Sequence, residues 1–224
     1  MSRKGKRRIG QCVYCGEEKE LSGDHVPPKN LFKKPRPNNL ITVDSCDKCN
    51  RSYQKDDEYF RAITATLEKS EKHLEAKELW ETKIMPSYLK SNKIGFREMI
   101  RQSLKPIEIL TEGGIFLGRR IGYEIDVDRF NNVIQRTIKG LFWHERRFRL
   151  SDEFEVKIKM QPDVREIKPE VLDAFAAIRP KIIGNNVFVY RALFFDEEPY
   201  GSGWLLSFYQ SMNFICLTVP RNKN

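Results

Sequence analysis

The chain of 224 residues has no long apolar run and only three histidines. No stretch approaches the roughly 20 consecutive apolar residues that a membrane helix needs, so we expect no membrane contact. The basic start, MSRKGKRRIG, is not followed by the apolar segment of a secretory signal, and we therefore expect a cytoplasmic protein. There is no internal repeat and no low-complexity tract. A hydrophobic content of 40% with 32% charged residues is typical of a soluble globular protein.

Cysteine is scarce and its placement is uneven. Four of the five cysteines form two Cys-X2-Cys pairs, Cys12/Cys15 in CVYC and Cys46/Cys49 in CDKC. In a reducing compartment such pairs indicate metal ligands and not disulfides. Four thiolates are the ligand set of a closed tetrahedral zinc site, so we predict structural Zn²⁺ there. Cys216 lies in the apolar run NFICLTV, which predicts a buried, inert thiol.

Positive charge exceeds negative charge, mainly near the start of the chain. The net charge is +9, and residues 1–56 carry 13 Lys/Arg against 7 Asp/Glu, so that quarter holds +6 of it. A polyanion partner, most commonly nucleic acid, is the natural interpretation, while a tail that aids solubility is the alternative. We expect salt-dependent phosphate contacts from the basic residues of the first segment and of one loop. They are Arg3, Lys4, Lys6, Arg7 and Arg8, and then Lys29, Lys33, Lys34 and Arg36.

The chain divides into four segments. Residues 1–9 are predicted to form a flexible basic arm. Residues 10–57 are rich in Gly, Pro and Asn with little apolar mass, so we expect a metal to replace the missing core. Residues 58–106 predict a helical segment. It begins with a long helix, in one or two pieces, from Asp56 to before Pro86, and a second helix follows from Ser87 to Leu104, with Gly95 as a candidate interruption. Residues 107–224 predict an α+β domain of unknown role.

The last segment alternates between strand and helix patterns. Residues 107–120 predict a strand or hairpin around Gly113-Gly114, and Asp126 or Asp128 could cap the next helix. FEVKIKM predicts a strand, and KPEVLDAFAAI predicts a short helix. The runs VFVYRALFF, WLLSFYQ and NFICLTV predict an antiparallel meander. The fold class is therefore α+β, in which a zinc-stapled N-terminal module and a helical segment precede an antiparallel sheet with helices.

One order of residues points to a known family. A Cys pair is followed by Asp24-His25 with Pro27 close behind, then by Asn39-Leu40, and then by a second Cys pair with Asn50 directly after it. This order resembles the HNH endonuclease family and its ββα-metal fold, in the HNN version. The resemblance covers about residues 10–57.

The resemblance implies a catalytic role for each of these residues. His25 would be the general base, Asn39 would hold its imidazole in a working tautomer, and Asp24 and Asn50 would hold Mg²⁺ or Mn²⁺. Asp24 and His25 point oppositely on an extended strand, although a bend at Pro27 could bring both around one ion. Many family members have His in place of Asn50, and an amide oxygen favours a harder ion.

Two functions are therefore compared. The first is a metal-dependent endonuclease acting on DNA, which is favoured over RNA, and we expect the double-stranded form. The second is a non-catalytic, zinc-dependent adaptor for nucleic acid or protein, which would be indifferent to replacement of His25. A zinc-dependent hydrolase of small molecules is disfavoured, because four thiolates leave no open coordination position. The C-terminal half carries no motif, and it could choose the target, form a homo-oligomer or dock a partner protein.

Overall fold

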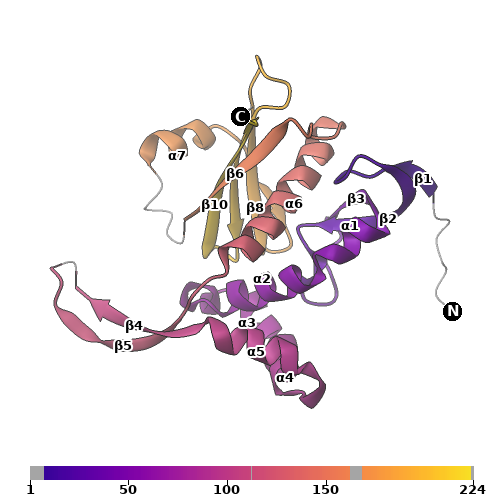
Figure 1. Cartoon of the computed structure of the whole chain (residues 1–224). Helices are drawn as coiled ribbons and strands as arrows, with labels where there is room; N and C mark the ends of the chain where they lie inside the picture. Colours follow the sequence, from indigo (N-terminus) through magenta and orange to yellow (C-terminus); the bar gives the residue numbers. More distant parts are fainter. Residues whose placement is uncertain (1–7, 112, 162–167, 223–224) are drawn as a thin grey trace.

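A computed structural model describes residues 8–111, 113–161 and 168–222 (Figure 1). A three-stranded sheet comes first, followed by a layer of short helices, a two-stranded hairpin, a long helix and a five-stranded sheet. The predicted α+β class, with its C-terminal antiparallel sheet, is confirmed. No helix of the described residues is long and apolar enough to cross a bilayer. Four predicted phosphate contacts, Arg3, Lys4, Lys6 and Arg7, lie outside the described residues.

The N-terminal sheet is antiparallel, in the order β1-β2-β3. Its strands are β1 (Arg8–Gln11), β2 (Glu18–Val26) and β3 (Ile41–Cys46). Arg8 and Ile9, predicted as part of a flexible arm, instead pair with Leu21 and Glu20 of β2. The loop from β2 to β3 contains the short helix η1 (Lys29–Leu31), and two helices follow β3, α1 (Asp47–Ser52) and α2 (Gln54–Thr66).

The helical segment is more broken than predicted. After α2 come η2 (Glu68–Lys72), α3 (Leu74–Leu79), the π-helix η3 (Trp80–Ile84), α4 (Met85–Leu89), η4 (Ser91–Lys93) and α5 (Ile94–Ser103). α2 ends at Thr66 because Leu67 is extended, with ψ 142°. The expectation that the helix ends before Pro86 is wrong, since Pro86 lies in the first turn of α4, where a missing backbone N–H is tolerated.

The predicted hairpin is present and is followed by a long helix. Strands β4 (Leu104–Leu110) and β5 (Phe116–Tyr123) form it, and α6 (Val127–Arg146) comes next. Asp126 is the N-cap of α6 and accepts a hydrogen bond from the Arg129 N–H at 3.2 Å. The helix ends at Arg147, which adopts the left-handed conformation with φ 63°.

The C-terminal sheet has the order β6-β10-β9-β8-β7, with every neighbouring pair antiparallel. The strands are β6 (Phe154–Gln161), β7 (Lys181–Ile183), β8 (Phe188–Phe194), β9 (Ser202–Phe208) and β10 (Met212–Pro220). The predicted short helix is α7 (Pro169–Ala176), between β6 and β7. Cys216 is fully buried in β10, and burial raises the pKa of its thiol, as expected for an inert cysteine.

One apolar core joins the N-terminal sheet to the C-terminal sheet, with α6 between them (Figure 1). The Phe60 ring of α2 lies 4.7 Å from Phe130 of α6 and 5.0 Å from Phe208 of β9, measured between ring centroids. α6 also approaches β2 closely at Gly140, where an added Cβ would lie 2.5 Å from the Val26 Cγ2. The long helix is therefore part of the support beneath the N-terminal module.

Candidate active site

The four paired cysteines meet at one point. Cys12 and Cys15 lie in the turn after β1, Cys46 ends β3, and Cys49 lies in α1. Their sulfur atoms all lie within 4.8 Å of one another, and Cys15 Sγ is 4.0 Å from Cys46 Sγ. Zinc–sulfur bonds of 2.3 Å in a tetrahedron separate the sulfurs by about 3.8 Å. The cluster therefore fits a structural zinc ion.

The protein also prepares one of these thiols for ionisation. Burial opposes ionisation of Cys12, but backbone N–H groups of Cys15, Cys46 and Tyr14 lower its pKa to about 7. One of them is the Cys46 N–H, which donates to Cys12 Sγ at 3.3 Å. Burial raises the pKa of Cys15 and Cys49. Because only thiolates bind zinc tightly, a bound cation would have to supply the remaining ionisation energy.

Asp24 and Asn50 line one cavity of about 290 Å³. Asp24 reaches it from β2 and Asn50 from α1, so the sheet and the first helix together bring the two predicted ligands to one place. The Asn50 Nδ2 donates to Ser22 Oγ at 3.1 Å and to the Gly23 carbonyl at 3.3 Å. The amide nitrogen is thus tied to β2, and the carbonyl oxygen is the group left for a ligand. The other lining residues are Gly23, Pro28, Lys29, Asn30, Gln54, Asp57, Glu58 and Arg61.

Asp24 is 8% exposed, and its carboxylate contacts two buried side chains. The Tyr14 hydroxyl donates to Asp24 Oδ2 at 2.8 Å, and Arg136 Nε lies 3.9 Å from the same oxygen. Burial and the neighbouring Asp24 charge raise the pKa of Tyr14, so its hydroxyl stays a donor. Both contacts are made to Oδ2, which leaves Oδ1 as the oxygen for the cavity.

A second carboxylate, that of Asp57, also contacts the buried Arg136 guanidinium. Arg136 Nη2 donates to both Asp57 oxygens, at 2.8 Å each, and the guanidinium lies 5.0 Å from the centre of the Tyr53 ring. Burial raises the pKa of Asp57 to about 6, although Arg136 opposes this shift. Burial alone would lower the pKa of Arg136, but Asp57 and Asp24 raise it. The result is a compensated group of two acids and one cation.

Tyr14, Asp57 and Arg136 were not among the predicted site residues. The sequence feature that could have indicated Arg136 lies in α6. Arg136 falls on the helix face that carries Val133, Thr137 and Gly140, all buried. A charged residue on an apolar stripe needs a buried partner. The sequence alone does not say which acid that partner is, because it lies in α2.

His25 follows Asp24 on β2, in extended backbone that alternates successive side chains between the two faces of a strand. It is half-buried, and the described residues that line the cavity do not include it. Its Nδ1 lies 3.0 Å from the Thr42 Oγ1, directly across the strand pair. Burial and the nearby Lys29 charge lower the pKa of His25, despite Asp24. The ring is therefore neutral near pH 7.

The structure does not hydrogen-bond Asn39 to His25. The Asn39 Nδ2 donates to the Ile182 carbonyl at 2.8 Å and so ties the loop before β3 to β7. Thr42 occupies the position beside Nδ1 that the resemblance gave to Asn39. The pairing of β2 with β3 explains this, because it sets His25 opposite Thr42.

The predicted basic residues are not equally available. Arg8 pairs with Asp44, and Lys33 pairs with Glu78. Lys34 is exposed, Lys29 lines the cavity, and Arg36 Nε donates to the Lys29 carbonyl at 3.3 Å. For Lys29, Lys34 and Arg36, phosphate contact stays a prediction.

A further cation of the cavity is Arg61 of α2, which was not predicted. Its Nε is buried, and no group in the described ranges accepts a hydrogen bond from it. The buried Oδ1 of Asn30, another lining residue, likewise has no donor in that part of the chain. Unsatisfied buried polar atoms at a cavity call for a ligand or water.

Comparison with known families assigns the N-terminal module. Residues 12–56 match the family model described as HNH endonuclease. This range begins at the first cysteine of the metal cluster and includes Asp24, His25 and Asn50. Neither the curated proteins nor the solved structures contain a significant match to the chain.

Proposed function

We propose that this HNH module is the active site of a metal-dependent endonuclease that hydrolyses phosphodiester bonds of DNA, the double-stranded form in particular. The observation that carries the proposal is the shared cavity, in which Asp24 and Asn50 meet beside the cations Lys29 and Arg61. The family match supports a function related to nucleic acid. The uneven positive charge of the first 56 residues supports a polyanionic substrate.

The donor set of the cavity suits a hard divalent ion. Asp24 Oδ1 and the Asn50 carbonyl oxygen are oxygen ligands, which Mg²⁺ and Mn²⁺ prefer, with water and phosphate oxygens in the other positions. When bound, such an ion would stabilise negative charge on the phosphate and the departing 3′ oxygen. The four-cysteine site is closed and would serve structure alone.

His25 would act as the general base. Its lowered pKa favours the neutral imidazole, and in the tautomer whose Nδ1–H donates to Thr42 Oγ1, Nε2 would take a proton from the attacking water. Lys29 lines the cavity and also lowers the pKa of His25, so the same charge acts on the cavity and on the histidine. Lys29 and Arg61 would bind phosphate oxygens. By the family resemblance, the products carry 5′-phosphate and 3′-hydroxyl ends.

A specific observation favours the second candidate, a non-catalytic adaptor. Asp24 already has two partners at Oδ2, and His25 is not among the residues that line the cavity. If the acid served only the buried ion pair, the module would bind nucleic acid or protein without cleaving it. The two candidates differ in what replacement of His25 does.

The decisive test is cleavage of supercoiled plasmid in Mg²⁺ or Mn²⁺. We expect the wild-type protein to nick or linearise the plasmid, and EDTA to abolish this. His25→Ala should lose at least about a hundredfold in rate with zinc content unchanged, because a general base contributes that much. His144→Ala, a half-buried histidine on α6, is the matched control and should keep activity.

The other outcomes are equally informative. Equal cleavage by wild type and His25→Ala would remove His25 from the mechanism. A shifted DNA band without cleavage, unaffected by His25→Ala, would favour the adaptor. The role predicted for Asn39 stays a prediction. Comparing the cleavage rates of Asn39→Ala and Thr42→Ala tests which of the two side chains supports the His25 imidazole.

A further inference from the structure

A second cavity, of about 370 Å³, shares no lining residue with the cavity of Asp24 and Asn50. Its volume falls within the roughly 300–1,000 Å³ that is usual for small-molecule sites. The lining comes from α2, η2, α3, η3 and β5, and consists of Ala65, Thr66, Glu71, Lys77, Trp80, Glu81 and Tyr123. This mixture of aromatic and charged side chains has no role in the proposed nuclease reaction.

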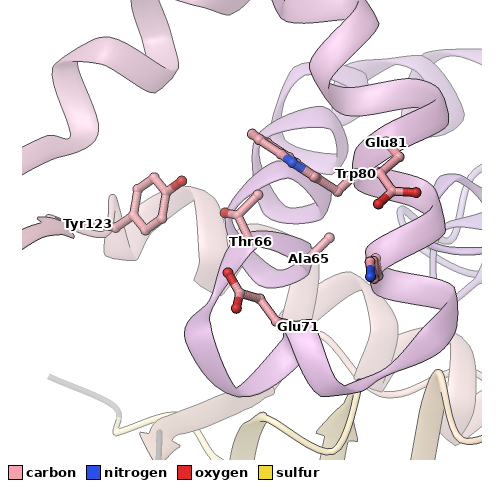
Figure 2. A pocket seen from close by; sticks show the side chains of 7 residues that line it. Ala65, Thr66, Glu71, Trp80, Glu81 and Tyr123 are labelled. Carbon is pink, nitrogen blue, oxygen red and sulfur yellow. The ribbon is translucent and has the colours of Figure 1, made fainter.

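Two aromatic side chains form walls of this second cavity. Figure 2 shows the Tyr123 ring opposite Thr66, with the Trp80 indole on one side of Thr66 and the Glu71 carboxylate on the other. Both rings are partly buried and pack against the apolar core, so they are held in place. The faces of Trp and Tyr rings attract cations.

Three polar groups at the cavity can only accept hydrogen bonds from a ligand. Glu71 and Glu81 are exposed, and within the described ranges neither carboxylate has an ion-pair or hydrogen-bond partner. The Thr66 hydroxyl donates to the Ala62 carbonyl at 2.8 Å, so only its lone pairs remain for a ligand. A ligand that satisfies these groups must be rich in hydrogen-bond donors.

The charge of the lining favours a cation. Lys77 is the only lining residue with a positive charge, against Glu71 and Glu81, so the cavity carries a net charge of −1 in a protein whose net charge is +9. Lys77 precedes Glu81 by four residues, the spacing at which side chains on one helix face are neighbours. It therefore balances one carboxylate and leaves the other for the ligand. The net negative charge disfavours phosphate and hence nucleic acid.

The helix that carries Trp80 and Glu81 is irregular at this point. The π-helix η3 (Trp80–Ile84) separates α3 from α4, and the residues that flank it, Leu79 and Met85, have α-helical backbone angles. A π-turn that interrupts an α-helix is rare and is frequently located at a functional site. Here the irregular turn begins with the two residues that line the cavity.

A smaller cavity, of about 120 Å³, adjoins the larger one and shares Thr66, Trp80 and Tyr123 with it. No charged residue lines it, and most of its other lining side chains are apolar or aromatic, including Ile84 and Met85. The two cavities together suit a ligand that has a charged head and an apolar stem.

We propose that the two cavities bind an organic cation of the guanidinium type, with its head between Trp80 and Tyr123 against Glu71 and its stem in the smaller cavity. A guanidinium has five N–H donors and no acceptor, stacks on aromatic rings and pairs with carboxylates. Its source is either a free small molecule or an arginine side chain of a partner protein. This inference does not depend on nuclease activity.

The first test is isothermal titration of the full-length protein with Nα-acetyl-arginine amide. We expect saturable binding, and binding at least about tenfold weaker for Nα-acetyl-citrulline amide, which has nearly the same shape but no charge. A peptide with one arginine between alanines separates the two sources. Clearly tighter binding of the peptide assigns the site to a partner protein, and equal binding assigns it to a free small molecule.

The second test replaces the charges of the larger cavity. Glu71→Gln should weaken binding of the arginine amide about tenfold, because it removes a charge-assisted hydrogen bond. Lys77→Gln should tighten binding, because it removes a like charge. Both side chains are exposed, so thermal unfolding should be unchanged. Glu170→Gln is the matched control, since Glu170 is exposed on α7 and lines neither cavity, and it should bind as wild type.

Four outcomes would overturn the proposal. They are no saturable binding below about 10 mM, equal binding of the arginine and citrulline amides, wild-type affinity in Glu71→Gln, and no tightening of binding in Lys77→Gln. Weaker binding by Lys77→Gln would instead assign the cavity to an acidic ligand.

Discussion

Arg136 is the cation that balances the two buried carboxylates of the site, Asp24 and Asp57. It is 4% exposed, donates twice to Asp57 and lies 3.9 Å from Asp24. Two acids this deeply buried are tolerated because one guanidinium balances them. Arg136 therefore fixes the position of a proposed metal ligand from a helix far along the chain.

Replacement of Arg136 tests that role. Arg136→Met should lower the free energy of unfolding by about 3–5 kcal/mol, because it leaves buried carboxylates without a partner. Urea unfolding followed by circular dichroism measures this change. The double variant Arg136→Met/Asp57→Asn should recover part of the loss, since it removes one orphaned charge. If the double variant lost as much unfolding free energy as the two single variants together, the coupling would be contradicted.

At the scale of elements, the cysteine cluster ties together the turn after β1, the end of β3 and α1. These segments are short, so a metal bound there would replace the apolar mass that they lack. Cys46→Ala should lose zinc and unfold the N-terminal sheet. Zinc content by mass spectrometry and amide exchange in β2 and β3 measure both effects. Cys216→Ala, a buried thiol outside the cluster, is the control and should keep its zinc.

That prediction has a clear contrary outcome. If Cys46→Ala retained full zinc content and native exchange rates, Cys46 would not be a ligand. If His25→Ala lost zinc as well, the separation between the structural and catalytic residues would fail.

The packing of α6 on β2 depends on Gly140. Glycine in a helix interior costs about 1 kcal/mol relative to alanine, so its presence there needs a reason. An added Cβ would lie 2.5 Å from Val26, and Gly140→Ala should therefore destabilise the protein by about 1–3 kcal/mol through overpacking. Gly95→Ala in α5 is the matched control. Nothing lies within 4 Å of its added Cβ, so we expect equal or higher stability in thermal unfolding.

At the scale of the whole molecule, the apolar core of the N-terminal half includes side chains from the C-terminal half. Phe60 packs against Phe130 of α6 and Phe208 of β9, and Asp57 depends on Arg136. A fragment of residues 1–106 should therefore not fold cooperatively, even with zinc. Circular dichroism and amide spectra beside the full chain test this. A folded, zinc-loaded fragment would instead support independent domains with the boundaries that the sequence suggested.

Local patterns predicted much of the fold. Alternation in FEVKIKM and NFICLTV marked β6 and β10, and Asp126, one of two candidate caps, is the N-cap of α6. The expectation for Pro86 failed because a proline in a first helical turn does not stop a helix. The partner of His25 could not be found this way, since strand register, not sequence distance, sets Thr42 opposite it.

The sequence by itself determined which four cysteines pair into one cluster, the order of residues that matches the HNH family, and the α+β class. Each rests on residue identity and short spacing, which act within a few positions along the chain. Only the tertiary structure decided that Arg136 balances Asp24 and Asp57, that Arg61 and Lys29 flank their cavity, and that β4 and β5 form a two-stranded sheet of their own. These contacts join residues far apart in sequence, and they exist only after distant apolar faces have packed and fixed which polar groups are buried together.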